Sequence, residues 1–407
     1  PEVSAPSSPV TGADVFAQTA GGDLTIQLAV TAGEQTHAYW LWTNTASRPT
    51  DPIGDPDGYA DAGDDFISLI ELDLTQSHVV QVTHTNDAGS ATSTLTLTPQ
   101  VLTATAADGS AAGDGATESG GDGGAGASAT ATITEATAEY GPSAVAFDLT
   151  GGSGGAGGRD GASNAGGASG PGARITGSLP VQSGDVLTLH AGGGGGDGAG
   201  DANTLDAFGR GGGSTHPIGY DGGNGGYPGE QGFSGGGGGG GAATVLTRTR
   251  SDVDDDVVAA GGGGGGGTGN DPRADLGARD FDAGDTASST IGGTGQDVEA
   301  GEEAVGTSRD DTTGTFTVPS TVDDDNENGR KDGGGGGGGG GGLDGGGRGR
   351  LYYVSSLPEF FGRGGRRGRS SVSLDDLTVD APASTAGSQR AGGAGTVRYH
   401  TIAVSHG

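Results

Sequence analysis

Few residues of this sequence have the types and spacing that catalysis requires. The chain has no cysteine, and its histidines match neither the H-E-x-x-H pattern of zinc proteases nor a G-x-S-x-G nucleophile arrangement. Lys331 is followed by Asp332 instead of Ser or Thr, which excludes a Walker A phosphate loop despite the many glycines. We therefore expect that the protein is not an enzyme. The scattered histidines are His37, His78, His84, His190, His216, His400 and His406.

One oxygen-rich segment has the spacing of a cation-binding loop. The segment begins at Asp324, and its first half has oxygen ligands at positions 1, 3 and 5 of an EF-hand loop, with Gly329 at the turn. Gly335 stands at position 12, where an EF-hand loop has its bidentate Glu. Two interpretations are open: a site for Ca²⁺ or another hard cation, and an acidic loop without an ion. Asp254–Asp256 form a second candidate. The ligands in the first candidate are Asp324, Asn326, Asn328 and Asp332.

Residues 348–369 concentrate arginine and aromatic side chains in an otherwise acidic chain. Arginine beside aromatic rings is typical of binding hot spots and of carboxylate or glycan recognition. The alternative is internal pairing of these arginines with the Asp-rich segments, and both interpretations are open. Nucleic acid is not expected as a partner, because the net charge of −33 repels phosphate. The receptor-binding candidates are Tyr352, Tyr353, Phe360, Phe361, Arg363, Arg366, Arg367 and Arg369.

The charge balance indicates adaptation to high salt. The chain has 52 acidic residues against 19 basic ones, and Lys331 is the only lysine. Such a charge repels itself at low ionic strength, but at molar salt the Debye length falls to about 3 Å and the repulsion is screened. We expect a protein made in a haloarchaeal cytoplasm. The start of the sequence has no signal-peptide pattern, and no stretch is long enough to insert into a membrane.

Residues 1–100 have the alternating pattern of antiparallel strands. Residues 78–99 predict a hairpin with its turn at Asn86–Gly89. This hairpin resembles the last two strands of bacterial and viral immunoglobulin-like domains, with Trp40 or Trp42 as the core tryptophan; the resemblance implies a β-sandwich and no activity. The alternating sets are Leu24, Ile26, Leu28 and Val30; Ala38, Trp40 and Trp42; Ile70, Leu72 and Leu74; Val80 and Val82.

Glycine dominates the rest of the chain, and its runs alternate with short strand-like segments. Residues 101–136 are expected to form a linker or stalk, and residues 137–407 a glycine-rich domain. A glycine run can form a threefold extended helix of the polyglycine II type, whose peptide groups point outward and must bond neighbouring helices. We thus expect an all-β protein with almost no α-helix: an immunoglobulin-like sandwich, then stacked polyglycine II helices with short hairpins. Structural positions are Gly235, Gly238, Gly264, Gly338, Trp40 and Trp42.

The glycine-rich blocks resemble two known kinds of domain. Residues 235–267 are similar to the glycine-rich domain of receptor kinases of the anaplastic lymphoma kinase type, in which a hairpin also joins two glycine runs. The block ARITGSLPVQSGDVLTLHAGGGGG and the ending GGAGTVRYHTIAV resemble modules of phage tail proteins, and the tip adhesins of T-even-like phages are similar in function. This chain departs from them in being far more acidic, in its N-terminal domain and in its Asp-rich inserts.

The resemblance implies a tail-fibre or tail-tip adhesin in the virion of a haloarchaeal tailed virus. The N-terminal domain is then expected to bind other tail or baseplate proteins, and the glycine-rich domain to bind a host surface glycoprotein or glycan, in a homo-oligomer. Two alternatives are a capsid turret or decoration protein with a structural role only, and a cellular haloarchaeal surface adhesin.

Overall fold

The described part of the chain consists of strands and extended segments. It contains no helix and is about 47% strand, so the expected all-β class is confirmed for this part. It accordingly offers no helix able to cross a membrane. The computed structural model describes residues 15–28, 36–43, 58–60, 66–86, 89–115, 117–134, 142–159, 166–202, 204, 206–226, 235–251, 253–265, 267, 338–342, 351–354, 359–362, 368, 370–372, 378–380 and 390–406.

The strands form three sheets. The largest has the order β4 (Gly58–Ala60), β3 (Thr36–Thr43), β6 (His78–Asn86), β7 (Gly89–Thr105), β18 (Ala394–His406), β9 (Pro142–Thr150), β1 (Val15–Ala20), β2 (Asp23–Leu28) and β5 (Phe66–Leu69), with β10 (Arg174–Pro180) on β9 and β17 (Thr378–Asp380) on β10. The second has the order β16 (Ser371–Val372), β13 (Val253–Ala259), β12 (Thr244–Arg250), β11 (Val186–Ala191) and β8 (Ala127–Thr132). The third pairs β14 (Leu351–Val354) with β15 (Glu359–Gly362).

The N-terminal strands enclose a first core. Strands β1, β2 and β5 supply apolar side chains from one side, and β6, β7 and β18 supply them from the other. The predicted hairpin of residues 78–99 is confirmed: β6 and β7 pair antiparallel from His78 opposite Leu97 to Asn86 opposite Gly89. Tyr39 and Leu41 of β3 pack against this core, while the side chains of Trp40 and Trp42 lie outside the described part.

One predicted strand is wrong. The alternation of Ile70, Leu72 and Leu74 predicted a strand, but the strand ends at Leu69 and Ile70 is 71% exposed. The carboxylate of Asp73 accepts hydrogen bonds from the amide and hydroxyl of Thr75 at 2.8 and 2.6 Å. Such an Asx turn satisfies the backbone locally and competes with strand pairing.

Strands β7 and β18 form a long ribbon that joins two cores. All 13 residues of β18 pair antiparallel with β7. In the first core the ribbon buries Leu97 and Ile402; in the second it buries Val397, and the partly buried Leu102 packs against that core. Leu97 and Leu102 are five positions apart, as are Val397 and Ile402, so the two cores lie against opposite faces of the ribbon. Residues 137–407 were expected to form the glycine-rich domain, and no pairing of their last strand with the N-terminal sheet was predicted.

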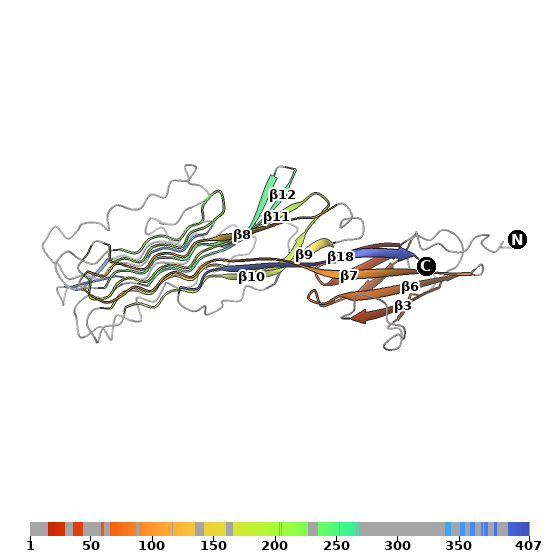
Figure 1. The fold of residues 1–407 in the computed structure, drawn as a ribbon, viewed down its shortest axis with the longest axis horizontal. Helices are drawn as coiled ribbons and strands as arrows, with labels where there is room; N and C mark the ends of the chain where they lie inside the picture. Colours follow the sequence, from red (N-terminus) through yellow and green to blue (C-terminus); the bar gives the residue numbers. More distant parts are fainter. Residues whose placement is uncertain are drawn as a thin grey trace.

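The glycine segments lie side by side at the end of the elongated molecule opposite β3 and β6 (Figure 1). We call them the glycine bundle. Backbone groups bond these segments to one another, and the longer ranges fold back so that their own successive passes also bond side by side. The bundle comprises residues 106–126, 151–172, 192–226, 235–243, 260–267, 338–342 and 390–393, as far as these are described.

Hydrogen bonds in the bundle repeat every three residues. In the central run 235–243, N–H groups three residues apart donate to the same neighbouring segment, so the N–H groups of the run reach three segments in all. The carbonyls of the run accept from three further segments. The run is therefore bonded to six neighbours. The amides of Gly236, Gly239 and Ala242 donate to the carbonyls of Ala199, Gly196 and Gly193. Those of Gly237 and Gly240 donate to Gly226 and Gly223, and those of Gly238 and Gly241 donate to Gly265 and Gly262.

The bundle has no room for side chains at most of its glycines. A Cβ atom on Gly235, Gly238, Gly264 or Gly338 would lie closer than 3.0 Å to a backbone carbonyl oxygen of another segment. The outer segments admit a side chain at every third position instead, as at Asp122 and Ala125, which are exposed between pairs of glycines. This G-G-x pattern is a signal in the sequence that marks segments at the surface of the bundle.

Candidate binding hairpin and buried clusters

The aromatic binding candidates lie on the hairpin of β14 and β15. Tyr352 is opposite Phe361, and Tyr353 is opposite Phe360. Successive residues of a strand belong to opposite faces, so each face of the ribbon has one Tyr–Phe pair of positions. Among the described residues this hairpin pairs with no third strand. An isolated two-stranded ribbon is marginally stable in water, so such a hairpin gains stability from packing or from a partner.

The arginine candidates follow the hairpin in the sequence. Arg363, Arg366, Arg367 and Arg369 lie outside the described residues, but the backbone beside them is placed. The amide of Gly368 donates to the carbonyl of Gly261 at 3.2 Å, and the hydroxyl of Ser370 accepts from the amide of Ala260 at 3.1 Å. The structure thus places Gly368 and Ser370 beside the glycine run 260–267.

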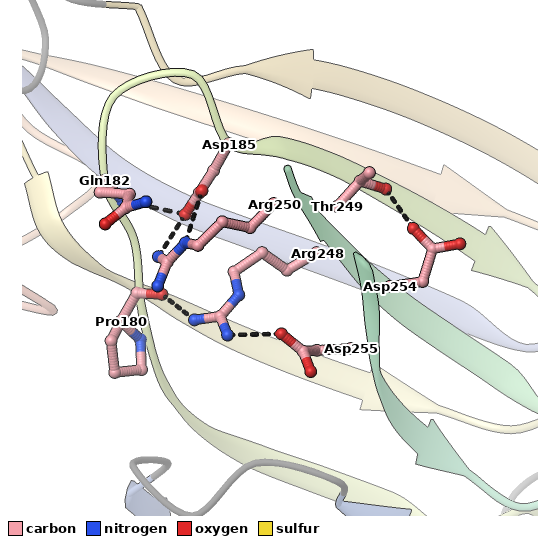
Figure 2. Close-up of polar contacts among 8 residues, drawn as sticks. All are labelled: Pro180, Gln182, Asp185, Arg248, Thr249, Arg250, Asp254 and Asp255. Atoms are coloured by element: carbon pink, nitrogen blue, oxygen red, sulfur yellow. Dashed lines mark hydrogen bonds and ion pairs between the residues drawn. The ribbon is translucent and has the colours of Figure 1, made fainter. Parts of the chain in front are cut away.

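Of the two cation-site candidates, the loop containing Asp324, Asn326, Asn328 and Asp332 lies outside the described residues. The acidic run on β13 is described, and its three carboxylates accept hydrogen bonds from different residues. Asp254 accepts from the Thr249 hydroxyl at 2.6 Å, and Asp255 pairs with Arg248 at 2.6 Å (Figure 2). No cluster of three metal-binding side chains occurs in the described part. The second candidate is therefore a set of cross-strand pairs.

Arginines of the described part are held by aspartates. Arg250 makes two hydrogen bonds to Asp185, at 2.8 and 2.6 Å, and the same carboxylate accepts from the amide of Gln182 at 2.9 Å (Figure 2). The side chain of Asp185 is only 1% exposed, so this pair is shielded from salt. The alternative interpretation of residues 348–369 expects the same internal pairing of their arginines, which lie outside the described residues. The paired arginines are Arg159, Arg174, Arg210, Arg248, Arg250 and Arg390.

We expect Asp185→Asn to lower the free energy of unfolding by about 2 kcal/mol, because Arg250 loses its charged partner inside the fold. Asp122→Asn is the control, since Asp122 is 83% exposed and lies 3.3 Å from Arg210; its effect should stay below about 0.5 kcal/mol. Denaturant unfolding in molar salt measures both. Equal effects of the two substitutions would contradict the assignment.

The structure also brings together histidines that are scattered in the sequence. His78 and His400 meet edge to face with ring centroids 5.2 Å apart, and burial lowers the pKa of His400. His190 and His216 meet in the same way at 5.0 Å. Burial, assisted by the charge of His216, lowers the pKa of His190 to about 4. Spacing in the sequence gives no signal for either pair, because the bundle and the ribbon create them.

Comparison of the sequence with protein-family models and with curated proteins finds no match. What the chain does must therefore be inferred from its own residues and geometry.

Proposed function

We propose that this chain is an attachment protein in the tail of a virus of haloarchaea, in which the glycine bundle is a rigid carrier for a surface-binding hairpin. The observation that carries the proposal is the bonding of the bundle, where a run of glycines is tied to six neighbours. A chain so rich in glycine would otherwise lose too much conformational entropy to fold. A rigid carrier of this kind suits a protein that must hold binding loops away from a particle.

We propose that the runs are polyglycine II helices. Two features support this: the threefold repeat of donors along run 235–243, and the bonds of this run, whose partners all lie in other parts of the chain. A left-handed extended helix has three residues per turn and no internal hydrogen bonds, which gives both features.

The N-terminal strands are proposed to be an immunoglobulin-like sandwich that binds other tail or baseplate proteins. Support comes from the first core, to which strands β1, β2 and β5 and strands β6, β7 and β18 all contribute, and from the β6–β7 hairpin. The sandwich and the bundle lie at opposite ends of the long axis (Figure 1), so one end can dock while the other is presented.

The hairpin β14–β15 and the arginines after it are the proposed contact with the host. Tyrosine and arginine supply most of the energy at binding hot spots. Arginine can bind a carboxylate with two hydrogen bonds, and such a contact survives molar salt when it is partly desolvated, as the Arg250–Asp185 pair illustrates inside the fold. A surface layer of acidic glycoprotein or glycan offers these carboxylates.

One observation favours a second candidate, a virion component with a structural role only. Arginines of the described part pair with aspartates of the same chain. If Arg363–Arg369 do likewise, the hairpin region holds the protein together and contacts no receptor.

Binding of the purified chain to intact haloarchaeal cells in molar NaCl separates the two candidates. Deleting residues 355–367, which leaves the bonds of Gly368 and Ser370 to the bundle in place, or replacing Tyr353 and Phe360 by Ser, is expected to lower cell binding at least tenfold while the bundle still unfolds at its normal temperature. Val253→Ser, at a 61% exposed position near the tip of the β12–β13 hairpin, is the control and should bind normally. Unchanged binding by both hairpin variants would refute the receptor site, and a large loss of stability would favour the structural role.

A further inference from the structure

A cluster of buried polar side chains lies where the glycine bundle meets the second sheet. It contains His190 of β11, Thr247 of β12, Asp256 of β13, and His216 and Tyr220 from the turn 214–221. His190 and His216 are each 8% exposed, Asp256 is 4% exposed and Tyr220 is 1% exposed. Three strands of the sheet thus meet two side chains of one turn in a site that excludes water.

The contacts in this cluster are specific. Nε2 of His216 lies 3.6 Å from a carboxylate oxygen of Asp256, whose other oxygen accepts from the Thr247 hydroxyl at 2.8 Å. Nδ1 of His190 lies 2.9 Å from the Thr215 hydroxyl, and the ring of Tyr220 packs on that of His216 at 4.9 Å. The single carboxylate can balance one imidazolium. A second proton would place two positive rings 5.0 Å apart in a buried site.

The turn is held in a conformation that needs this cluster. Tyr220 has a φ of +80°, a left-handed value that is unfavourable for a large side chain. Its carbonyl accepts from the amide of Ala243 at 3.0 Å, which ties the turn to the start of β12. Within the turn, the amide of Ile218 donates to Nδ1 of His216 at 3.3 Å, so the imidazole also fixes the backbone. Release of His216 would free the strained turn.

We propose that the turn 214–221 is an acid-sensitive latch, closed while the two imidazoles share at most one proton and opened when both are protonated. Opening carries His216 and Tyr220 away from the sheet and lets water reach both rings. The open state therefore binds more protons than the closed state, so acid favours opening. Between the ordinary histidine pKa of 6.5 and the value of about 4 for buried His190, the closed state loses stability as the pH falls.

Other charged groups near the turn do not supply this behaviour. Asp221 accepts from the amide of Ser214 at 2.5 Å, and burial raises its pKa, so its protonation favours the closed turn and opposes the latch. Asp256 favours protonation of His190, and its charge partly offsets the repulsion between the two rings. His190 and His216 are therefore the groups whose double protonation opens the turn.

Hydrogen exchange of the full chain in molar salt tests the latch. The measured quantity is the protection factor of the peptide 214–221, corrected for the intrinsic exchange rate, at pH 7 and at pH 5. A pKa that rises from about 4 to 6.5 on opening predicts about twentyfold lower protection at pH 5. The central run up to residue 242, whose amides donate to segments other than the turn, serves as the internal control and should stay protected at both values. Equal protection of 214–221 at both values would overturn the proposal, and the wild-type chain alone gives this result.

His190→Gln identifies the titrating group, because glutamine keeps a polar contact for Thr215 and cannot take up the proton. We expect its protection at 214–221 to change less than threefold between the two pH values. His216→Gln removes the neighbouring charge but leaves His190 buried, so it should lower the pH dependence only in part. His190→Asn replaces the first variant if that one does not fold. A twentyfold loss that persists in a folded His190 variant would assign the effect to other groups and reject the latch.

Discussion

Replacing Gly212 by alanine is expected to lower the free energy of unfolding by at least about 3 kcal/mol, or to prevent folding, whereas Gly213→Ala should be close to wild type. A Cβ on Gly212 would overlap the carbonyl oxygen of Gly193, closer than the 3.0 Å that real Cβ atoms keep. A Cβ on Gly213 has its nearest neighbour, the carbonyl oxygen of Gly124, at 3.7 Å. The two positions are adjacent and the substitution is the same, so the difference isolates the packing of backbone against backbone.

Denaturant unfolding of both variants in molar salt measures this difference. Gly213→Ala also restricts the unfolded chain, which by itself would stabilise by roughly 0.4–1 kcal/mol. The same argument applies to valine at Gly264 and Gly338, where the added atoms would meet the carbonyl oxygens of Gly238 and Gly223. Wild-type stability of Gly212→Ala would mean that the segments are loosely associated, and the rigid-carrier proposal would lose its basis.

The second large effect is expected at the ribbon. Val397→Asp puts a carboxylate into the second core at a position with no exposed surface, and should cost at least about 4 kcal/mol. Ala403→Asp makes the same change to an exposed position of the same strand and should cost less than about 1 kcal/mol. Thermal unfolding followed by circular dichroism compares them.

Val397→Asp also tests whether the ribbon couples the two cores. Val397 packs in one core and Ile402 of the same strand packs in the other. We expect the first core to lose stability too, read out by increased hydrogen exchange of β1 and β2. Unchanged exchange in those strands would mean that the cores fold independently despite the shared ribbon.

The strands were the most predictable part of the fold. Short strand-like segments were expected between the glycine runs, and strands β9, β11 and β14, which contain Val145, Leu187 and Tyr352, are found in that part of the chain. Alternating side chains and turn residues act locally, so the sequence displays them. The wrong strand at residues 70–74 has a local cause as well, since the side chain of Asp73 competes for the backbone.

Features created by contacts between distant segments were not predictable in the same way. The change of face in the ribbon is visible in the sequence, because Leu95 and Leu97 occupy odd-numbered positions of the strand and the next leucine, Leu102, occupies an even-numbered one. The histidine cluster leaves no such trace: His190 and His216 meet only because a turn of the bundle folds onto the second sheet. For the hairpin of β14 and β15, the sequence predicted the residue types, and the structure added the cross-strand register of its aromatic positions.

The ribbon of β7 and β18 has a mechanical consequence. If the sandwich is fixed to a particle and the bundle grips a surface, a pull between them runs along these two strands. Both strands run from the first core to the bundle, so two backbones share a load along the axis, and their 13 residue pairs hold them side by side. The chain is thus built to resist tension along its long axis, and a sideways peel from the C-terminal end of β18 is the direction in which it should yield first.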